Sequence, residues 1–126
     1  MTEHLPIETA VLLQNKDIEI FSHDTPTKLA SMVVEEAQEL KEAIDMAFVN
    51  DDVTEVASEI GDVFYLMIRL CDELGIDWRE ATQMKVLRNE AKYKGQPDAQ
   101  TARAKWNGGD ALFFQTYLNE LAKLTE

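Results

Sequence analysis

Two long segments with apolar residues at helical spacing follow each other in this chain, joined only by a short polar turn over 50–52. The first is expected to form a helix over 26–49, with Thr25 as its cap. The second is expected over 53–74, ending at Gly75, which can adopt the left-handed conformation that stops a helix. Helices joined by such short connections pack antiparallel. The sequence therefore predicts an all-α, antiparallel helical bundle.

Further helices are expected on both sides of this hairpin. One covers 6–21 and is followed by a loop over 22–26. Another covers 77–93 and begins with a sequence typical of a capping box. After a polar loop through 95–104, a last amphipathic helix is expected over 110–124, where aromatic and leucine side chains form a stripe.

Length and composition limit the class of protein. With 126 residues, of which 45% are hydrophobic, the chain is expected to form a single domain over 1–126. Its net charge of −12 disfavours DNA, RNA and anionic membranes as partners. A single cysteine, Cys71, excludes an intrachain disulfide. The first ten residues resemble no signal peptide and no apolar run is long enough to span a bilayer, so a cytoplasmic location is expected.

Acidic residues fall within the apolar faces of both hairpin helices when positions are placed at 100° per residue. On the first helix, Glu36 lies in the middle of the apolar arc and Glu39 just inside its edge. On the second, Glu59 lies inside the arc and Asp62 on its border. An unpaired carboxylate in a core costs several kcal/mol. These acids must therefore be paired, protonated or bound to a metal.

Pairing with bases is insufficient, because Lys41 alone accompanies ten acids over 35–62. Four carboxylates offer the hard oxygen ligands that suit Mg²⁺ or Mn²⁺. Zinc fits poorly, since His4 and His23 lie outside the cluster. A di-iron site would need a Glu-x-x-His sequence on two helices, which the hairpin lacks. Two alternatives stay open: a solvated helix face, and a splayed bundle with water between the helices.

The acids form a spaced motif: Glu35-Glu36-x-x-Glu39, then 19 residues, then Glu59-x-x-Asp62. This EExxE…ExxD pattern, in its helical context over about 28–93, resembles the MazG-like, all-α nucleoside triphosphate pyrophosphohydrolases. The resemblance implies a Mg²⁺-dependent enzyme, with Mn²⁺ as a substitute. Such an enzyme would cleave a (deoxy)nucleoside triphosphate to the monophosphate and pyrophosphate, in house-cleaning of the nucleotide pool.

The resemblance also implies roles for individual residues. The metal ligands would be Glu36, Glu39, Glu59 and Asp62. Glu35 would lie beside them, either as an outer-shell group or as the base that orients water. We expect Glu35 to be the base that positions and deprotonates water, with Glu39 as the fallback.

A basic segment follows the motif. Residues 79–105 hold seven bases against three acids in an otherwise acidic chain. The resemblance implies that Lys85 and Asn89, with Arg88 and Lys92 nearby, bind the phosphates. A solvated basic helix is the simpler alternative.

Groups that contact the base are expected near the N-terminus and on the second hairpin helix, again by resemblance. The candidates are Phe21, His23 and Tyr65. The resemblance further implies a homodimer or homotetramer that completes the bundle. A phosphoribosyl-ATP pyrophosphohydrolase, which shares the superfamily, is the nearest alternative enzyme, and a non-catalytic helical interaction module is the alternative outside enzymes.

Overall fold

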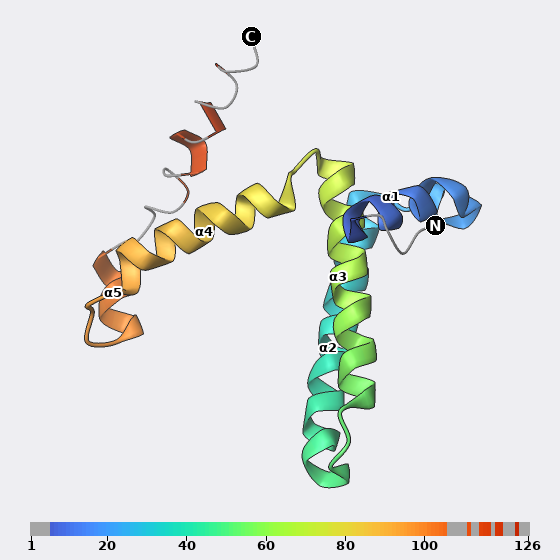
Figure 1. Cartoon of the computed structure of the whole chain (residues 1–126), viewed down its shortest axis with the longest axis horizontal. Helices are drawn as coiled ribbons and strands as arrows, with labels where there is room; N and C mark the ends of the chain where they lie inside the picture. The colour runs from blue at the N-terminus through green and yellow to red at the C-terminus, as the bar shows by residue number, and fades with distance from the viewer. Residues whose placement is uncertain (1–5, 106–110, 112–113, 117, 120–122, 124–126) are drawn as a thin grey trace. The chain divides into compact units, whose positions relative to one another are not determined.

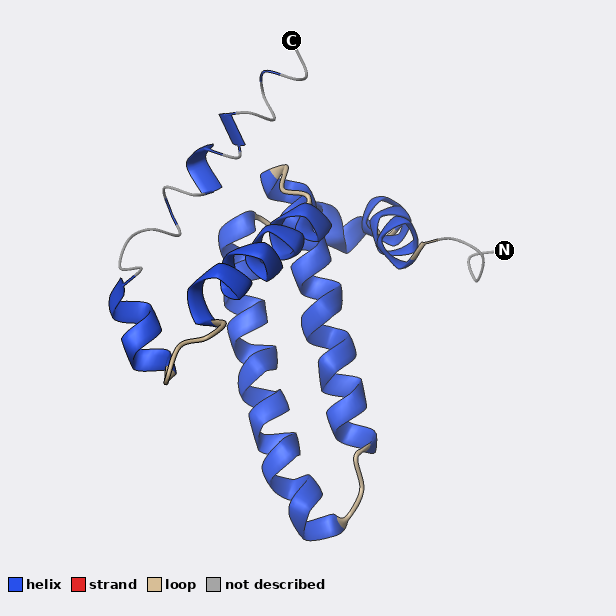
Figure 2. Cartoon of the chain, turned by 60° about the vertical axis from the view of Figure 1, so that its left-hand side comes forward, coloured by secondary structure: helices blue, strands red, loops and turns tan. Residues whose placement is uncertain are grey.

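The computed structural model describes residues 6–105, 111, 114–116, 118, 119 and 123 (Figure 1). The elements are α1 (Ile7–Asp17), the 3₁₀ helix η2 (Glu19–His23), α2 (Pro26–Asn50), α3 (Thr54–Leu74), α4 (Trp78–Tyr93) and α5 (Ala99–Lys105). Within this part of the chain every regular element is helical, so the predicted all-α class is confirmed (Figure 2). The chain forms two compact units, residues 1–78 and 79–126.

The predicted hairpin is formed by α2 and α3, which lie side by side (Figures 1 and 2). Its start is fixed as expected, since the Thr25 hydroxyl accepts a hydrogen bond from the Lys28 backbone N–H at 3.1 Å. Its end is also as expected, because Gly75 is left-handed with φ 68°. At the turn, Asp52 Oδ1 accepts from the Thr54 backbone N–H at 2.9 Å and begins α3. The caps thus set the hairpin's length.

The prediction of one helix over 6–21 is wrong. The α-helix α1 ends at Asp17, and Ile18 has extended backbone with φ −89° and ψ 106°. The chain then forms η2, which also replaces part of the loop predicted over 22–26. The extended residue interrupts the α-helical hydrogen bonding, and the tighter turn that follows brings η2 against α1.

The loop predicted through 95–104 is also corrected, because α5 occupies its second half. Asp98 supplies the start signal, since its Oδ1 accepts from the Thr101 backbone N–H at 2.7 Å. The last predicted helix, over 110–124, lies for the most part outside the described residues.

The core of the first unit lies where α1 packs against α3 and where α2 begins. Its buried side chains are Val11, Leu29, Leu66, Ile68 and Arg69. Large apolar residues are exposed along α3 and at the residue before it, and we call them the α3 stripe: Val53, Ile60, Phe64, Met67 and Leu74. Among the described helices, none has both the length and the apolar character that crossing a membrane requires.

Candidate metal centre

Three carboxylates converge at mid-height of the α2–α3 hairpin. Glu36 of α2 and Glu59 and Asp62 of α3 each offer an oxygen, and these atoms lie within 4.8 Å of one another. Residues three apart on a helix share a face, so α3 presents its two acids together. The antiparallel α2 then supplies Glu36 opposite them. We call these three residues the acid cluster.

Two oxygens of the acid cluster are buried without a partner. Glu36 Oε2 and Glu59 Oε2 have no hydrogen-bond partner among the described residues. Buried polar atoms are nearly always hydrogen-bonded, and a lone one costs free energy. An arrangement of carboxylate oxygens that lacks donors fits a hard divalent cation such as Mg²⁺ or Mn²⁺.

The electrostatics of Glu36 reflect this crowding. The approach of the Glu59 carboxylate is the main cause that raises the pKa of Glu36, from 4.5 to about 7. Burial of the side chain and the nearby Glu39 and Asp62 carboxylates raise the pKa further. Without a cation, the cluster therefore holds a proton near neutral pH.

The two other acids of the motif lie at the margin. Glu39 and Glu35 are both exposed, and neither belongs to the group whose oxygens meet within 4.8 Å. Glu39 is nevertheless near enough to contribute to the raised pKa of Glu36. The structure thus brings three of the four predicted metal ligands together and leaves the fourth beside them.

Two of the three predicted base-contacting residues lie together in the first unit. The rings of Phe21 and Tyr65 meet edge to face, with centroids 6.3 Å apart and planes at 64°. Tyr65 follows Asp62 of the acid cluster by three residues on α3. His23 is exposed at the end of η2.

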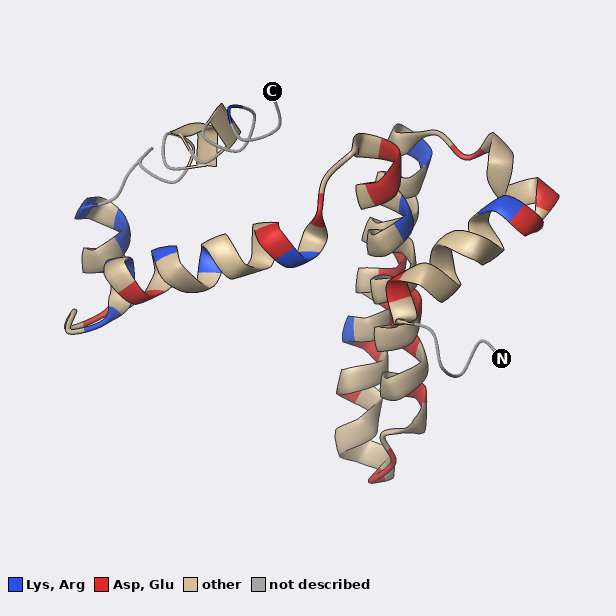
Figure 3. Cartoon of the chain, turned by 45° about the horizontal axis from the view of Figure 1, so that its top comes forward, with Lys and Arg blue, Asp and Glu red and all other residues tan. Residues whose placement is uncertain are grey.

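The four predicted phosphate-binding residues are all on α4, in the second unit. Figure 3 shows acids along α2 and α3, and bases on α4 and α5. Arg88 is buried, Lys92 is half-buried with its ammonium 5.4 Å from the Tyr93 ring, and Lys85 and Asn89 are exposed. Their role toward phosphate stays a prediction.

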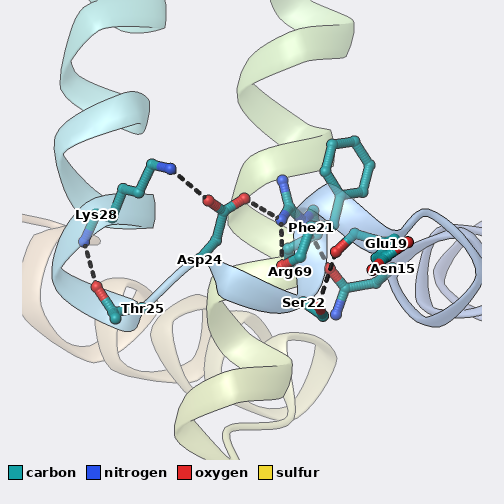
Figure 4. Close-up of polar contacts among 8 residues, drawn as sticks. All are labelled: Asn15, Glu19, Phe21, Ser22, Asp24, Thr25, Lys28 and Arg69. Atoms are coloured by element: carbon teal, nitrogen blue, oxygen red, sulfur yellow. Dashed lines mark hydrogen bonds and ion pairs between the residues drawn. The ribbon is translucent and has the colours of Figure 1, made fainter.

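An ion pair that sequence reasoning missed joins α3 to the N-terminal segment (Figure 4). Arg69 Nη2 lies 2.6 Å from Asp24 Oδ2, and the side chains are 1% and 6% exposed. Lys28 pairs with the same carboxylate at 2.8 Å. Lys28 and Arg69 together hold the pKa of Asp24 below its usual range. No sequence signal indicated this pair, since its members lie 45 residues apart and Arg69 falls outside the apolar arc of α3.

The comparisons with known proteins agree with this geometry. The family model described as phosphoribosyl-ATP pyrophosphohydrolase matches residues 12–86, which include the whole hairpin and every acid of the motif. No curated protein and no solved structure gave a match. The family match covers more than half of the chain. The chain therefore belongs to the phosphoribosyl-ATP pyrophosphohydrolase family, within the MazG-like superfamily of nucleoside triphosphate pyrophosphohydrolases.

Proposed function

We propose that this chain hydrolyses a (deoxy)nucleoside triphosphate to the monophosphate and pyrophosphate, with Mg²⁺ or Mn²⁺ bound at the acid cluster, and so clears unwanted nucleotides. The observation that carries the proposal is the pair of buried, unpartnered oxygens of Glu36 and Glu59 beside Asp62. Crowded carboxylates of this kind destabilise a fold unless a cation offsets them. Membership in a family of pyrophosphohydrolases supports the reaction class.

In this proposal Glu36, Glu59 and Asp62 hold the ion, with Glu39 as the fourth ligand. An ion held there would offset the charge of the triphosphate and polarise the phosphorus under attack. Glu35 positions and deprotonates a water molecule, and Glu39 is the fallback for that role.

The remaining candidates would bind the rest of the substrate. Donors on α4 would hold the phosphates and the charge that develops on the leaving pyrophosphate: Lys85, Arg88, Asn89 and Lys92. The ring pair of Phe21 and Tyr65 would stack on the base, and His23 is proposed as a third contact.

Glu35→Gln is expected to separate catalysis from metal binding. A glutamine cannot take a proton from water, and loss of a general base costs about 100-fold or more in turnover. Because Glu35 lies outside the acid cluster, the Mn²⁺ affinity of the Glu35→Gln variant should stay at the wild-type level. Glu39 lies beside the cluster, so Glu39→Gln should lower both turnover and Mn²⁺ affinity. Titration of Mn²⁺ and measurement of kcat on both variants check this. Loss of Mn²⁺ binding in Glu35→Gln would show that Glu35 is a ligand.

The family match favours phosphoribosyl-ATP as a second candidate substrate. The acid cluster would serve either substrate, since both contain a phosphoric anhydride.

The deciding experiment is a pyrophosphate-release assay on phosphoribosyl-ATP and on a panel of standard and modified (deoxy)nucleoside triphosphates, with Mg²⁺, Mn²⁺ or EDTA. Release from one or a few nucleoside triphosphates supports the proposal. Release from phosphoribosyl-ATP alone assigns the second candidate. Full activity in EDTA would overturn metal dependence, and silence with a folded, metal-binding protein would favour a non-catalytic module.

We also propose that the chain forms a homodimer or homotetramer through the α3 stripe. Phe64 is 61% exposed and Ile60 is 41% exposed, and at four residues apart they share one face of α3. Such a patch marks an interaction surface on a protein of this size. A second copy fits it, because a two-fold axis would place one apolar stripe against another.

Phe64→Glu is expected to convert the oligomer to a monomer. It places a charge in the middle of the proposed interface, where a buried unpaired carboxylate is costly. Light scattering after size exclusion measures the mass. Val49→Glu is the matched control, since Val49 is 76% exposed on α2 and lies outside the α3 stripe, and it should keep the wild-type mass. A monomeric wild-type protein would refute the proposal.

A further inference from the structure

The Arg69 side chain fixes three residues of the N-terminal segment at once. Its Nη2 donates to Asp24 Oδ2 at 2.6 Å and to the Phe21 carbonyl at 3.4 Å, and its Nε donates to Asn15 Oδ1 at 2.8 Å (Figure 4). The guanidinium carbon also lies 4.0 Å from the centroid of the Phe21 ring, within cation–π range. Arg69 thus holds both the backbone and the ring of Phe21.

The element that carries Phe21 is short and mostly exposed. It lies in η2, a five-residue 3₁₀ helix with no buried residue. Short 3₁₀ helices have poor hydrogen-bond geometry and contribute little stability of their own. The position of the Phe21 ring therefore depends on contacts from outside η2, and the Arg69 guanidinium over the ring is one of these.

The same contacts reach Tyr65. Its ring meets the edge of Phe21, and its hydroxyl donates to Gln14 Oε1 at 2.7 Å. Gln14 is the neighbour of Asn15, which Arg69 binds. The contacts therefore form a closed loop that runs through α1, η2 and α3. A displacement of Arg69 would therefore change how the Phe21 and Tyr65 rings lie against each other.

Tyr65, one member of this aromatic pair, lies one turn from the acid cluster on α3. Tyr65 is three residues beyond Asp62, a rise of about 4.5 Å along α3. Both rings are half-buried, so each keeps part of its surface accessible. A substrate whose phosphates were held at the acid cluster could reach these rings with its base.

We propose that Arg69 is a positioning residue for the substrate's base: it holds Phe21 against Tyr65 and so shapes the surface on which the base stacks. The inference rests on the proposed function, because it assumes a nucleotide at the acid cluster. Arg69 is too deeply buried to touch the substrate itself, at 1% exposure, and it acts through Phe21.

The test compares steady-state kinetics and Mn²⁺ binding in matched variants. Arg69→Met combined with Asp24→Asn removes the whole ion pair, so that no buried charge is left alone. Arg69→Lys keeps the charge but loses the planar guanidinium group that donates to several acceptors at once. Phe21→Leu removes the ring and leaves the ion pair. Lys28→Met is the control, because it removes the exposed partner of Asp24 without touching Phe21.

The double variant and Phe21→Leu should each raise KM for the preferred nucleotide about tenfold, the size of one lost stacking contact. Their kcat and Mn²⁺ affinity should stay near wild type. The differences in KM between nucleotides with different bases should become smaller. The KM of Arg69→Lys should lie between those of the wild type and the double variant. The KM of Lys28→Met should match that of the wild type. If the double variant does not fold, the KM of Arg69→Lys is the deciding measurement.

An unchanged KM in a folded Arg69 variant, or a parallel loss of Mn²⁺ binding, would overturn the inference about Arg69 and leave the proposed function standing. An inactive wild-type protein would overturn the proposed function and this inference with it.

Discussion

Glu36→Gln should abolish metal-dependent release of pyrophosphate, with a fall in kcat of roughly 1,000-fold or more. A bound metal supplies several kcal/mol of transition-state stabilisation, and each 1.4 kcal/mol is a factor of ten in rate. Glu36 is the residue that α2 contributes to the acid cluster, facing Glu59 and Asp62. A neutral amide in its place removes one of the charges that attract the ion. Mn²⁺ titration should show the loss directly.

The fold should survive this substitution, and the metal-free protein should become more stable. The amide has the shape of the carboxylate but does not repel Glu59, so near pH 8 the melting temperature should rise by about 4 °C for each kcal/mol of relief. Asp45→Asn is the matched control. It lies on the same helix, is exposed, pairs with Lys41 at 3.2 Å, and should change neither property. Wild-type turnover in Glu36→Gln would show that the ligands are misassigned.

The acid cluster could be predicted from sequence because it depends on local periodicity. The cost of burying a carboxylate makes any acid on an apolar arc informative, and Glu36 and Glu59 stood out for that reason. The hairpin could be predicted on similar grounds, from Thr25 as a cap and Gly75 as a stop. Each of these signals lies within a few residues of the feature that it determines.

The Arg69 contacts could not be predicted, because they depend on partners far away in the chain. Asp24 and Asn15 lie 45 and 54 residues from Arg69, and no local pattern links them. The break at Ile18 has the same origin. The apolar residues around it fit a continuous helix, and contacts of the following turn with α1 and Arg69 decide otherwise. Long-range polar contacts override local preference here.

The affinity for Mn²⁺ should rise with pH and level off above about pH 7. The pKa of Glu36 is raised to about 7, chiefly by the approach of Glu59, so below that pH the carboxyl holds a proton that the ion must displace. Apparent affinity should therefore increase about tenfold per pH unit between pH 5 and pH 7. Titrations at several pH values in a non-chelating buffer measure this. Glu36→Gln, which has no proton to displace at this position, serves as the control, and its weaker affinity should change less with pH.

The stability of the metal-free protein should move in the opposite direction. The folded state holds the proton of Glu36 with a pKa of about 7, against an ordinary value of 4.5. Between these values the folded state binds more protons than the unfolded state, so stability falls as pH rises, and the loss is complete above pH 7. Saturating Mn²⁺ should restore stability most at high pH, where binding is tightest. Denaturant unfolding with EDTA or Mn²⁺ at pH 5 and pH 8 measures both effects. A wild-type protein that behaves like Glu36→Gln at both pH values would show that Glu36 does not titrate near neutrality, and that the acid cluster is not the crowded site described above.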